Sequence, residues 1–433
     1  MDAGYYIKRT NGEPWQWNVW QPGMAVVDFT NPAATEWYLS KLRNLLDIGV
    51  DCFKTDFAER IPHLDVVFHD KSVDPVRMHN YYSVLYNEKV FGLLEEVKGK
   101  GEAVLFARSA HAGGQRFPVV SVFCKWRCLC SPDAQHWGGD CESTFEAMAE
   151  ATRGLLSLSL SGFGYGAHDI GGFEGLPPAE LYMRWVAFGM FTSHTRLHGS
   201  TSYRVPWLYG EAAAVAMSKL QDLKHRLMPY IFSYAIAAHT VGHPMHRPLF
   251  LEFPEDRTTH HLDRQYLLGS SLLVAPAYVA EKEEHEYYLP AGRWTELTTG
   301  RTLAGPRWVC ETVALDSIPV WVRAGSLLAL GPSGIGRPDY ALAEGVEVRV
   351  YELEDGATTQ LEVPSGQGAE LAGTIVASRK GDTIFVEAQG SVSFGTIGVF
   401  IDGYQITDGA EKQDGFLRVS VGAAKVEVKL AHV

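Results

Sequence analysis

Two short segments of this sequence place carboxylates beside residues that could give them a chemical role. The first, Lys54–Arg60, reads Lys-Thr-Asp-Phe-Ala-Glu-Arg and sets Asp56 two residues after a lysine. The second, His136–Cys141, reads His-Trp-Gly-Gly-Asp-Cys and sets Asp140 after two glycines. The lysine would hold Asp56 ionised, whereas an aromatic, partly desolvated pocket would keep Asp140 protonated.

An ionised and a protonated carboxyl together are what double-displacement cleavage of a glycosidic bond requires. The two groups must lie about 5–5.5 Å apart on opposite sides of the scissile bond, a geometry that the ends of two barrel strands can supply. Either aspartate alone could equally be a helix cap or one half of a structural ion pair, because acidic residues are common at strand ends.

The elements that must position these carboxylates alternate between strands and helices over residues 1–240. This alternation predicts a parallel α/β domain, in which polar residues that directly follow the strands form the active site. The predicted strands are 25–29, 50–54, 103–106 and 158–162. The predicted helices are 30–47, 74–97, 142–156, 180–190 and 212–238.

The C-terminal part of the chain has a different texture. From residue 241 the helical periodicity fades, and short apolar segments separated by Gly, Pro and Asp turns predict a β-sandwich over 241–335. The Gly/Pro-rich segment 331–336 is typical of a linker. It predicts a second β-sandwich over 336–433, after a catalytic domain over 1–240.

Composition excludes several classes of partner. With 38 basic and 51 acidic residues the net charge is −13, which argues against nucleic acid and anionic membranes as partners. No apolar run reaches membrane-span length, and no signal peptide is visible, so a cytoplasmic location is expected. The six cysteines include no Cys-x-x-Cys pair, and no metal or other cofactor is predicted. The sequence leaves a homo-oligomer open.

Several segments, in order along nearly the whole chain, resemble glycoside hydrolase family 31 and its α-xylosidase branch in particular. They are 15–23, 51–57, 106–109, 136–140, 161–164, 168–173 and 193–199. The resemblance implies a (β/α)8 barrel followed by two all-β sandwich domains. It also implies that the barrel is incomplete here, because the strand at 25–29 matches the third strand of the family.

The resemblance implies a role for each matched residue. Asp56 becomes the nucleophile and Asp140 the acid/base. The implied substrate-binding residues are Lys54, Arg108, His198, Phe173, Trp137 and Asp169, with Arg108 and His198 as ligands of sugar hydroxyls. Hydrogen bonds from such residues can strengthen as the sugar ring flattens toward the transition state. A structural loop histidine remains the alternative for His198.

The expected activity is therefore that of a retaining exo-α-xylosidase acting on an α-linked oligosaccharide. The segment Phe53–Phe57 favours this branch, since family α-glucosidases usually carry a Trp-Ile-Asp-Met type segment. An α-glucosidase or α-transglycosidase of the same family is the alternative, as is an inactive fragment. Ala58 departs from the usual family glycine, and Gly166–Ala167 replace a bulkier pair.

One segment has no counterpart in the family. Residues 120–135 separate Val119 from His136, hold Cys124, Cys128 and Cys130, and follow neither helix nor strand periodicity. Val-Ser at the start and Gln at the end can be encoded by splice-donor and splice-acceptor sequences. The segment is interpreted as a translated in-frame intron, with a genuine surface loop as the alternative.

Overall fold

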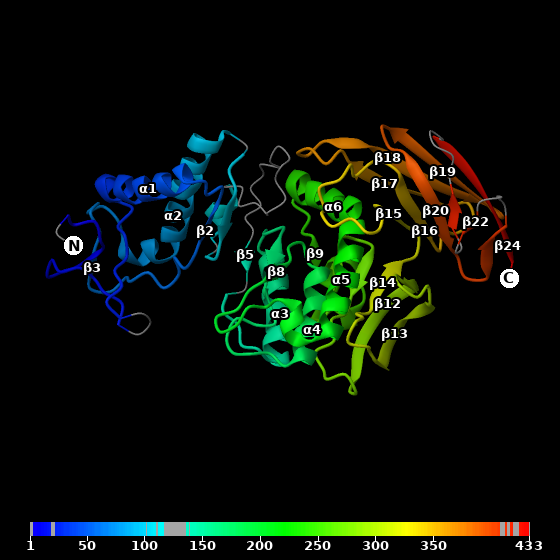
Figure 1. The fold of residues 1–433 in the computed structure, drawn as a ribbon, viewed down its shortest axis with the longest axis horizontal. Helices are drawn as coiled ribbons and strands as arrows, with labels where there is room; N and C mark the ends of the chain where they lie inside the picture. Colours follow the sequence, from blue (N-terminus) through cyan, green and yellow to red (C-terminus); the bar gives the residue numbers. More distant parts are fainter. Residues whose placement is uncertain are drawn as a thin grey trace. The chain divides into compact units, whose positions relative to one another are not determined.

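The computed structural model describes residues 3–18, 22–100, 102–109, 111–116, 136–137, 139–407, 412–413, 416–418 and 424–432 (Figure 1). The predicted insert at 120–135 lies outside these residues. The chain divides into two compact units, Met1–His136 and Trp137–Val433, and each is described by itself below.

In its described residues, the first unit has two long helices and four short strands that pair in twos. β1 and β3 are antiparallel, whereas β2 and β4 are parallel. Its elements are β1 (Lys8–Arg9), α1 (Pro32–Asp47), β2 (Phe53–Thr55), β3 (Val66–Val67), α2 (Pro75–Lys98), β4 (Leu105–Ala107) and the 3-10 helix η1 (Ala112–Arg116), before β5 (His136–Trp137).

Both long helices of the first unit begin as the sequence predicts. The side chain of Asn31 accepts hydrogen bonds from the first turn of α1, and Asp74 accepts one from Val76 N at the start of α2. A proline follows each cap, where its missing N–H costs nothing. The predicted strand at 25–29 is wrong: Ala25 and Val27 form only isolated antiparallel bridges, to Gln16 and Tyr6.

The helical part of the second unit surrounds two very short parallel strands, β7 and β8. Its elements are α3 (Phe145–Leu160), β6 (Gly166–Ala167), β7 (Asp169–Ile170), α4 (Ala179–Met190), β8 (Arg196–Leu197), the 3-10 helix η2 (Pro206–Tyr209), α5 (Glu211–Arg226) and α6 (Met228–Val241). None of the helices in the described ranges is both long and apolar enough to cross a lipid bilayer.

One predicted strand and one predicted helix in this region are wrong. Residues 158–160 form the last turn of α3 rather than a strand, because Leu155, Leu156 and Ser159 lie buried at helical spacing. The long predicted helix 212–238 is two helices, α5 and α6, which are separated at Leu227.

The rest of the second unit is built from antiparallel and mixed β-sheets. The first sheet has the order β13-β12-β14-β11-β10-β9, and β15 opens the next sheet by pairing with β16. The strands up to this point are β9 (His246–Arg247), β10 (Tyr266–Leu268), β11 (Leu272–Val274), β12 (Glu284–Glu296), β13 (Thr302–Thr312), β14 (Val320–Arg323) and β15 (Ser326–Leu330), with α7 (Leu249–Glu252) and η3 (Arg257–His261) between the first two.

The final β region places two five-stranded sheets around one apolar core. The orders are β15-β16-β20-β23-β22 and β17-β18-β19-β24-β21, and alternate residues of β16 and β19 are fully buried. The strands are β16 (Val346–Tyr351), β17 (Thr358–Pro364), β18 (Leu371–Lys380), β19 (Thr383–Gly390), β20 (Phe394–Phe400), β21 (Tyr404–Ile406), β22 (Lys412–Gln413), β23 (Phe416–Arg418) and β24 (Lys425–His432).

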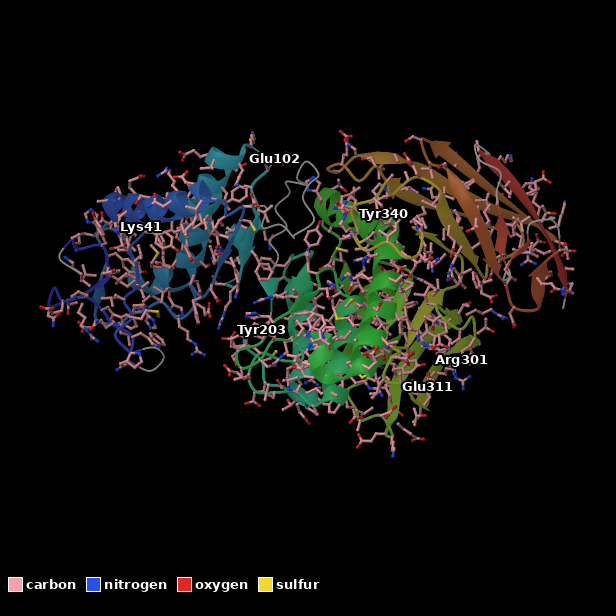
Figure 2. The ribbon with its side chains drawn as sticks, in the orientation of Figure 1. Lys41, Glu102, Tyr203, Arg301, Glu311 and Tyr340 are labelled. Atoms are coloured by element: carbon pink, nitrogen blue, oxygen red, sulfur yellow. The ribbon has the colours of Figure 1, made fainter. Side chains whose placement is uncertain are left out.

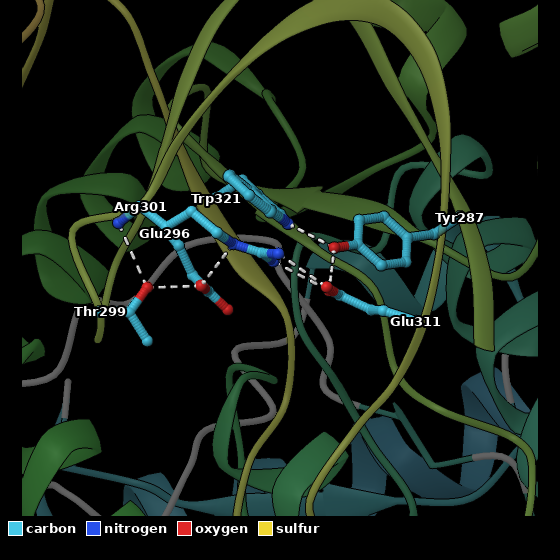
Figure 3. A network of polar contacts seen from close by, with 6 residues as sticks. All are labelled: Tyr287, Glu296, Thr299, Arg301, Glu311 and Trp321. Atoms are coloured by element: carbon cyan, nitrogen blue, oxygen red, sulfur yellow. Dashed lines mark hydrogen bonds and ion pairs between the residues drawn. The ribbon is translucent and has the colours of Figure 1, made fainter. Parts of the chain in front are cut away.

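A polar network centred on Arg301 connects strands β12, β13 and β14 (Figures 2 and 3). Arg301 pairs with Glu311 through both terminal nitrogens, at 2.8 and 3.0 Å, and its guanidinium lies 4.9 Å from the Trp321 ring centroid. Tyr287 donates to Glu311 at 2.6 Å and accepts from Trp321 Nε1 at 3.1 Å. Glu296 contacts the same arginine at 3.3 Å. One arginine thus links three strands.

Loss of this arginine should lower stability in a pH-dependent way. We expect Arg301→Met to lower the free energy of unfolding at pH 7 by about 1 kcal/mol, since solvent partly screens the pair. Burial opposes ionisation of Glu311, but hydrogen bonds from Arg301 and Tyr287 outweigh it and lower the pKa below the ordinary 4.5. The pair therefore stabilises the fold above pH 4.5 and loses this effect as pH falls through the folded-state pKa.

Urea denaturation of both proteins at pH 7 and pH 3 measures the effect. The difference between wild type and variant should shrink at pH 3. Arg307→Met, which removes an exposed arginine from the same strand β13, is the matched control and should change little. An equal loss in both variants would contradict the role of the network.

Candidate active site

Asp56 and Arg108 stand at the carboxyl ends of two parallel strands in the first unit. In the register of β2 and β4, Thr55 lies opposite Ala107, so the next residue of each strand is Asp56 or Arg108. Arg108 N donates to Thr55 O at 3.1 Å, which continues the ladder by one step. The guanidinium then reaches Asp56 Oδ1 at 3.5 Å. The two residues are therefore neighbours at these strand ends, as predicted.

Both oxygens of Asp56 have donors. Lys54 Nζ lies 3.0 Å from Oδ2, and Phe57 N donates to Oδ1 at 3.0 Å. Partial burial of Asp56 opposes ionisation, but the hydrogen bond and charge of Lys54, the Phe57 amide and Arg108 outweigh it. The pKa of Asp56 is therefore lowered below its ordinary 3.8. A carboxylate that stays ionised at neutral pH can act as a nucleophile but not as an acid.

The backbone after Asp56 adopts an uncommon conformation. Phe57, Ala58 and Arg60 have φ values of 59°, 72° and 59°, in the left-handed region that favours glycine. A glycine at the position of Ala58, as the family resemblance implies, would adopt this φ without strain. Non-glycine residues in this region cluster at functional sites, where the surrounding structure holds them. The turn changes the direction of the chain immediately after Asp56.

Glu59 is a member of this site to which the sequence analysis assigned no role. Its Oε1 accepts from Arg108 Nε at 2.9 Å, and the Arg108 guanidinium stacks 4.4 Å from the Phe57 ring centroid. Arg108 therefore bridges two carboxylates, and Glu59 orients the guanidinium that faces Asp56. The spacing of three residues between Asp56 and Glu59 was the sequence feature that could have indicated a role for Glu59. Only the turn at Phe57–Ala58 brings both to one arginine.

In the second unit, Asp140 is exposed on a short segment before α3. The carbonyl of the next residue, Cys141, accepts hydrogen bonds from Phe173 N at 2.7 Å and Glu174 N at 2.9 Å. Burial raises the pKa of the Cys141 thiol to about 11, so no thiolate competes with the neighbouring carboxyl. Ser143 is fixed by bonds to Glu174 O at 2.8 and 3.0 Å. The loop after β7 therefore positions the Asp140 segment.

Strands β7 and β8 and the residues after them hold three further predicted site residues, Asp169, Phe173 and His198. Asp169 pairs with Arg196 in register, and the Asp169 carboxylate, which is fully buried, lies 3.2 Å from the Arg196 guanidinium. Beyond these strands the Phe173 and His198 rings lie 5.4 Å apart at an angle of 31°. The structure thus gives the buried Asp169 a half-buried charged partner, Arg196. A substrate contact for Asp169 stays a prediction.

A buried lysine supports the β8 end of this site. Lys224 of α5 donates to Thr192 O at 2.7 Å and to Thr195 Oγ1 at 2.6 Å, just before β8. Burial lowers the pKa of Lys224 to about 7 and the pKa values of His168 and His246 to about 3. The two histidines are therefore neutral near pH 7.

Two other expectations can be compared with the structure. Trp137 forms β5 together with His136, and the role of its side chain stays a prediction. A Cβ at Gly166 would lie 2.1 Å from Leu155 Cδ1, so a bulkier residue could not enter without repacking α3. The small pair Gly166–Ala167 is therefore built into the core of this chain.

Sequence profiles of one family match almost the whole chain. "Glycosyl hydrolases family 31 TIM-barrel domain" matches residues 1–123 and 131–234. "Glycosyl hydrolase family 31 C-terminal domain" matches 242–328, and "Alpha-xylosidase YicI, C-terminal domain" matches 339–430. The first match is interrupted at 124–130, inside the predicted insert.

Curated relatives include two named α-xylosidases. One from Emericella nidulans is 47% identical over 355 residues, covering 80% of this chain and 43% of the relative. The other, Alpha-xylosidase XylQ of Lactiplantibacillus pentosus, is 39% identical over 439 residues, covering 99% of this chain and 53% of the relative. The chain thus spans about half the length of the curated relatives it matches.

Solved structures show the same fold. The cycloalternan-forming enzyme from Listeria monocytogenes superposes with a TM-score of 0.81 at 25% identity, covering 100% of this chain and 43% of that one. A family 31 α-xylosidase from a soil metagenome, complexed with xylose, gives 0.65 at 28% identity over 75% of this chain and 50% of that one. The expected TIM-barrel and β-rich C-terminal architecture is confirmed at this level. By these matches and its own motifs, the chain belongs to glycoside hydrolase family 31.

Proposed function

We propose that the protein containing this chain is a retaining exo-α-xylosidase that releases terminal α-xylose from small α-linked oligosaccharides. The observation that carries the mechanism is Asp56, which is held ionised by Lys54 and Arg108 at a strand end. The names of the two relatives at 47% and 39% identity support the sugar specificity.

In the first step Asp56 attacks the anomeric carbon of the terminal sugar. The bond from that carbon to the glycosidic oxygen breaks, and Asp140 donates its proton to the departing oxygen. Lys54 and the Phe57 amide hold the carboxylate in place for this attack, each through a hydrogen bond to one of its oxygens. The product is a covalent glycosyl-enzyme on Asp56.

In the second step Asp140, now a carboxylate, removes a proton from water. The water oxygen attacks the anomeric carbon, and the bond to Asp56 breaks, so that the carboxylate is regenerated and the configuration of the sugar is retained. Arg108 and Lys54 stabilise the carboxylate as it leaves. Arg108 and His198 are the proposed ligands of sugar hydroxyls.

A comparison of two substrates tests the specificity. The full-length protein should hydrolyse 4-nitrophenyl α-xyloside with a higher kcat/KM than the α-glucoside. A terminal hydroxymethyl group is the only difference between the sugars, so the ratio measures exclusion of that group. A clear preference for the glucoside would make the protein an α-glucosidase and overturn the proposal.

The second candidate is an α-glucosidase or α-transglycosidase of the same family. It is favoured by relatives named "Isomaltosyltransferase", from Sporosarcina globispora at 33% identity, and "Alpha-glucosidase 2", from Bacillus thermoamyloliquefaciens at 28%. Product analysis with an added sugar acceptor separates them, because a transglycosidase forms new α-linked oligosaccharides whereas a hydrolase releases free sugar.

We further propose that chain outside these 433 residues contributes to the catalytic barrel. The relatives are about twice as long as their match to this chain, which supports the proposal. Activity is therefore to be measured on the longer protein, and an equally active 433-residue chain would contradict it. An α-linked oligosaccharide is the proposed partner.

A further inference from the structure

Three segments of the second unit are linked in series, and a buried arginine, Arg204, holds the middle one. We call them the acid/base segment (139–143), the β7 loop (171–176) and the β8 loop (198–204). The acid/base segment is bound to the β7 loop by hydrogen bonds from Phe173 N and Glu174 N to Cys141 O. The β8 loop holds the β7 loop through Ser200 N, which donates to Phe173 O at 2.8 Å. Backbone hydrogen bonds thus link the acid/base segment to the β7 loop and the β7 loop to the β8 loop.

Arg204 lies at the centre of these loops, with only 2% of its surface exposed. Its Nε and one terminal nitrogen donate to Gly172 O at 3.1 and 2.8 Å, and the same terminal nitrogen reaches Gly175 O at 2.7 Å. The other terminal nitrogen donates to Ser202 Oγ and, at 3.2 Å, to Tyr209 Oη. In the described part of the chain its partners are carbonyls and hydroxyls, and none is a carboxylate.

Glycines allow this close approach. A Cβ at Gly172 would lie 2.6 Å from Glu142 O and 2.7 Å from Ser143 Cα, in the acid/base segment itself. A Cβ at Gly199 would lie 2.5 Å from Arg204 Cζ. The β7 loop therefore packs directly on the acid/base segment on one side, and the guanidinium packs directly on the β8 loop on the other.

We infer that Arg204 is a positioning residue for the acid/base: it fixes the β7 loop, and through that loop the main chain that carries Asp140. A planar guanidinium with several fixed donors suits this task, because it satisfies converging carbonyls at once. The inference rests on the proposed function, since it takes Asp140 as the acid/base. Arg204 itself touches no reacting atom.

The test compares leaving groups in the full-length protein. We expect Arg204→Lys to lower kcat/KM for phenyl α-xyloside about 100-fold, the scale of a misplacement of about 1 Å. For α-xylosyl fluoride the loss should be several-fold only, because fluoride leaves without a proton. Azide should then raise kcat on the fluoride, since azide needs no general base.

A matched control separates positioning from folding. Arg184 is also 2% exposed and also donates to carbonyls, those of Val313 and Ala314, away from the three loops. Arg184→Lys should affect both substrates equally. Gly199→Ala is a second variant that keeps Arg204 but displaces its guanidinium, and it should reproduce the leaving-group effect of Arg204→Lys even where that variant folds poorly.

Equal losses of kcat/KM on both substrates in Arg204→Lys and Gly199→Ala would overturn the inference, as would the same leaving-group dependence in Arg184→Lys. The specificity proposal is decided separately by the wild-type protein. If that protein prefers α-glucosides, the same leaving-group comparison is made with phenyl α-glucoside and α-glucosyl fluoride. Its outcome then still decides the role of Arg204.

Discussion

Replacement of Asp56 by asparagine is expected to abolish turnover of every α-glycoside, activated or not. Without the carboxylate no glycosyl-enzyme can form, and the loss should be on the order of 10⁶-fold in kcat, the scale seen when a covalent nucleophile is removed. Fluoride and aryl leaving groups should fail alike, because the missing bond is the one to the anomeric carbon. Steady-state rates of the full-length variant on α-xylosyl fluoride measure this loss.

The control for this variant lies on the same segment. Asp51→Asn removes an exposed aspartate that pairs with Lys98 at 3.0 Å, and its activity should equal that of the wild type. Added azide should not raise the rate of Asp56→Asn on α-xylosyl fluoride to that of the wild-type enzyme. Substantial hydrolysis of the fluoride by Asp56→Asn would show that another group is the nucleophile.

Asp140→Ala should instead produce a loss that depends on the leaving group. On phenyl α-xyloside, which needs proton donation, kcat/KM should fall by about 10²–10⁴-fold, the usual contribution of a general acid. On α-xylosyl fluoride the glycosyl-enzyme should still form, after which its hydrolysis becomes slow because no base activates water. Added azide should restore turnover and yield an α-xylosyl azide with retained configuration.

Glu142→Ala is the matched control, because Glu142 is an exposed carboxylate two residues further along the same segment. It should not change the response to azide. If Asp140→Ala and Asp56→Asn respond identically to the fluoride and to azide, the two roles are assigned wrongly.

The nucleophile side of the site was accessible from sequence because its geometry follows from a local rule. Parallel strands end at one edge of a sheet, so residues directly after 53–55 and 105–107 become neighbours. Asp56 contacts Arg108 because each directly follows a residue of the opposed pair Thr55 and Ala107. The helices at 32–47 and 75–98 were similarly predictable, since a polar cap and a proline mark each start.

The acid/base side was less predictable because its contacts are made between loops. Arg204 was assigned no role from the sequence, since nothing in its neighbourhood in sequence shows that it bonds to the Gly172 and Gly175 carbonyls. The strand predicted at 158–162 failed for another reason. Leu158 and Leu160 alternate with serine as in a strand, but the same run also fits the last turn of α3.

Arg204 packs against Gly199, and Gly172 packs against Glu142. Some positions in this region can therefore accept substitutions during evolution, whereas others cannot. A side chain at residue 199 would require a smaller residue at 204, so we expect these two positions to change together during evolution. Tyr203 and Trp207 flank the arginine in sequence, but they are 82% and 69% exposed (Figure 2 labels Tyr203). They are free of those steric limits. The exposed positions 203 and 207 could therefore change repeatedly during evolution while Arg204 and the glycines packed around it stay unchanged.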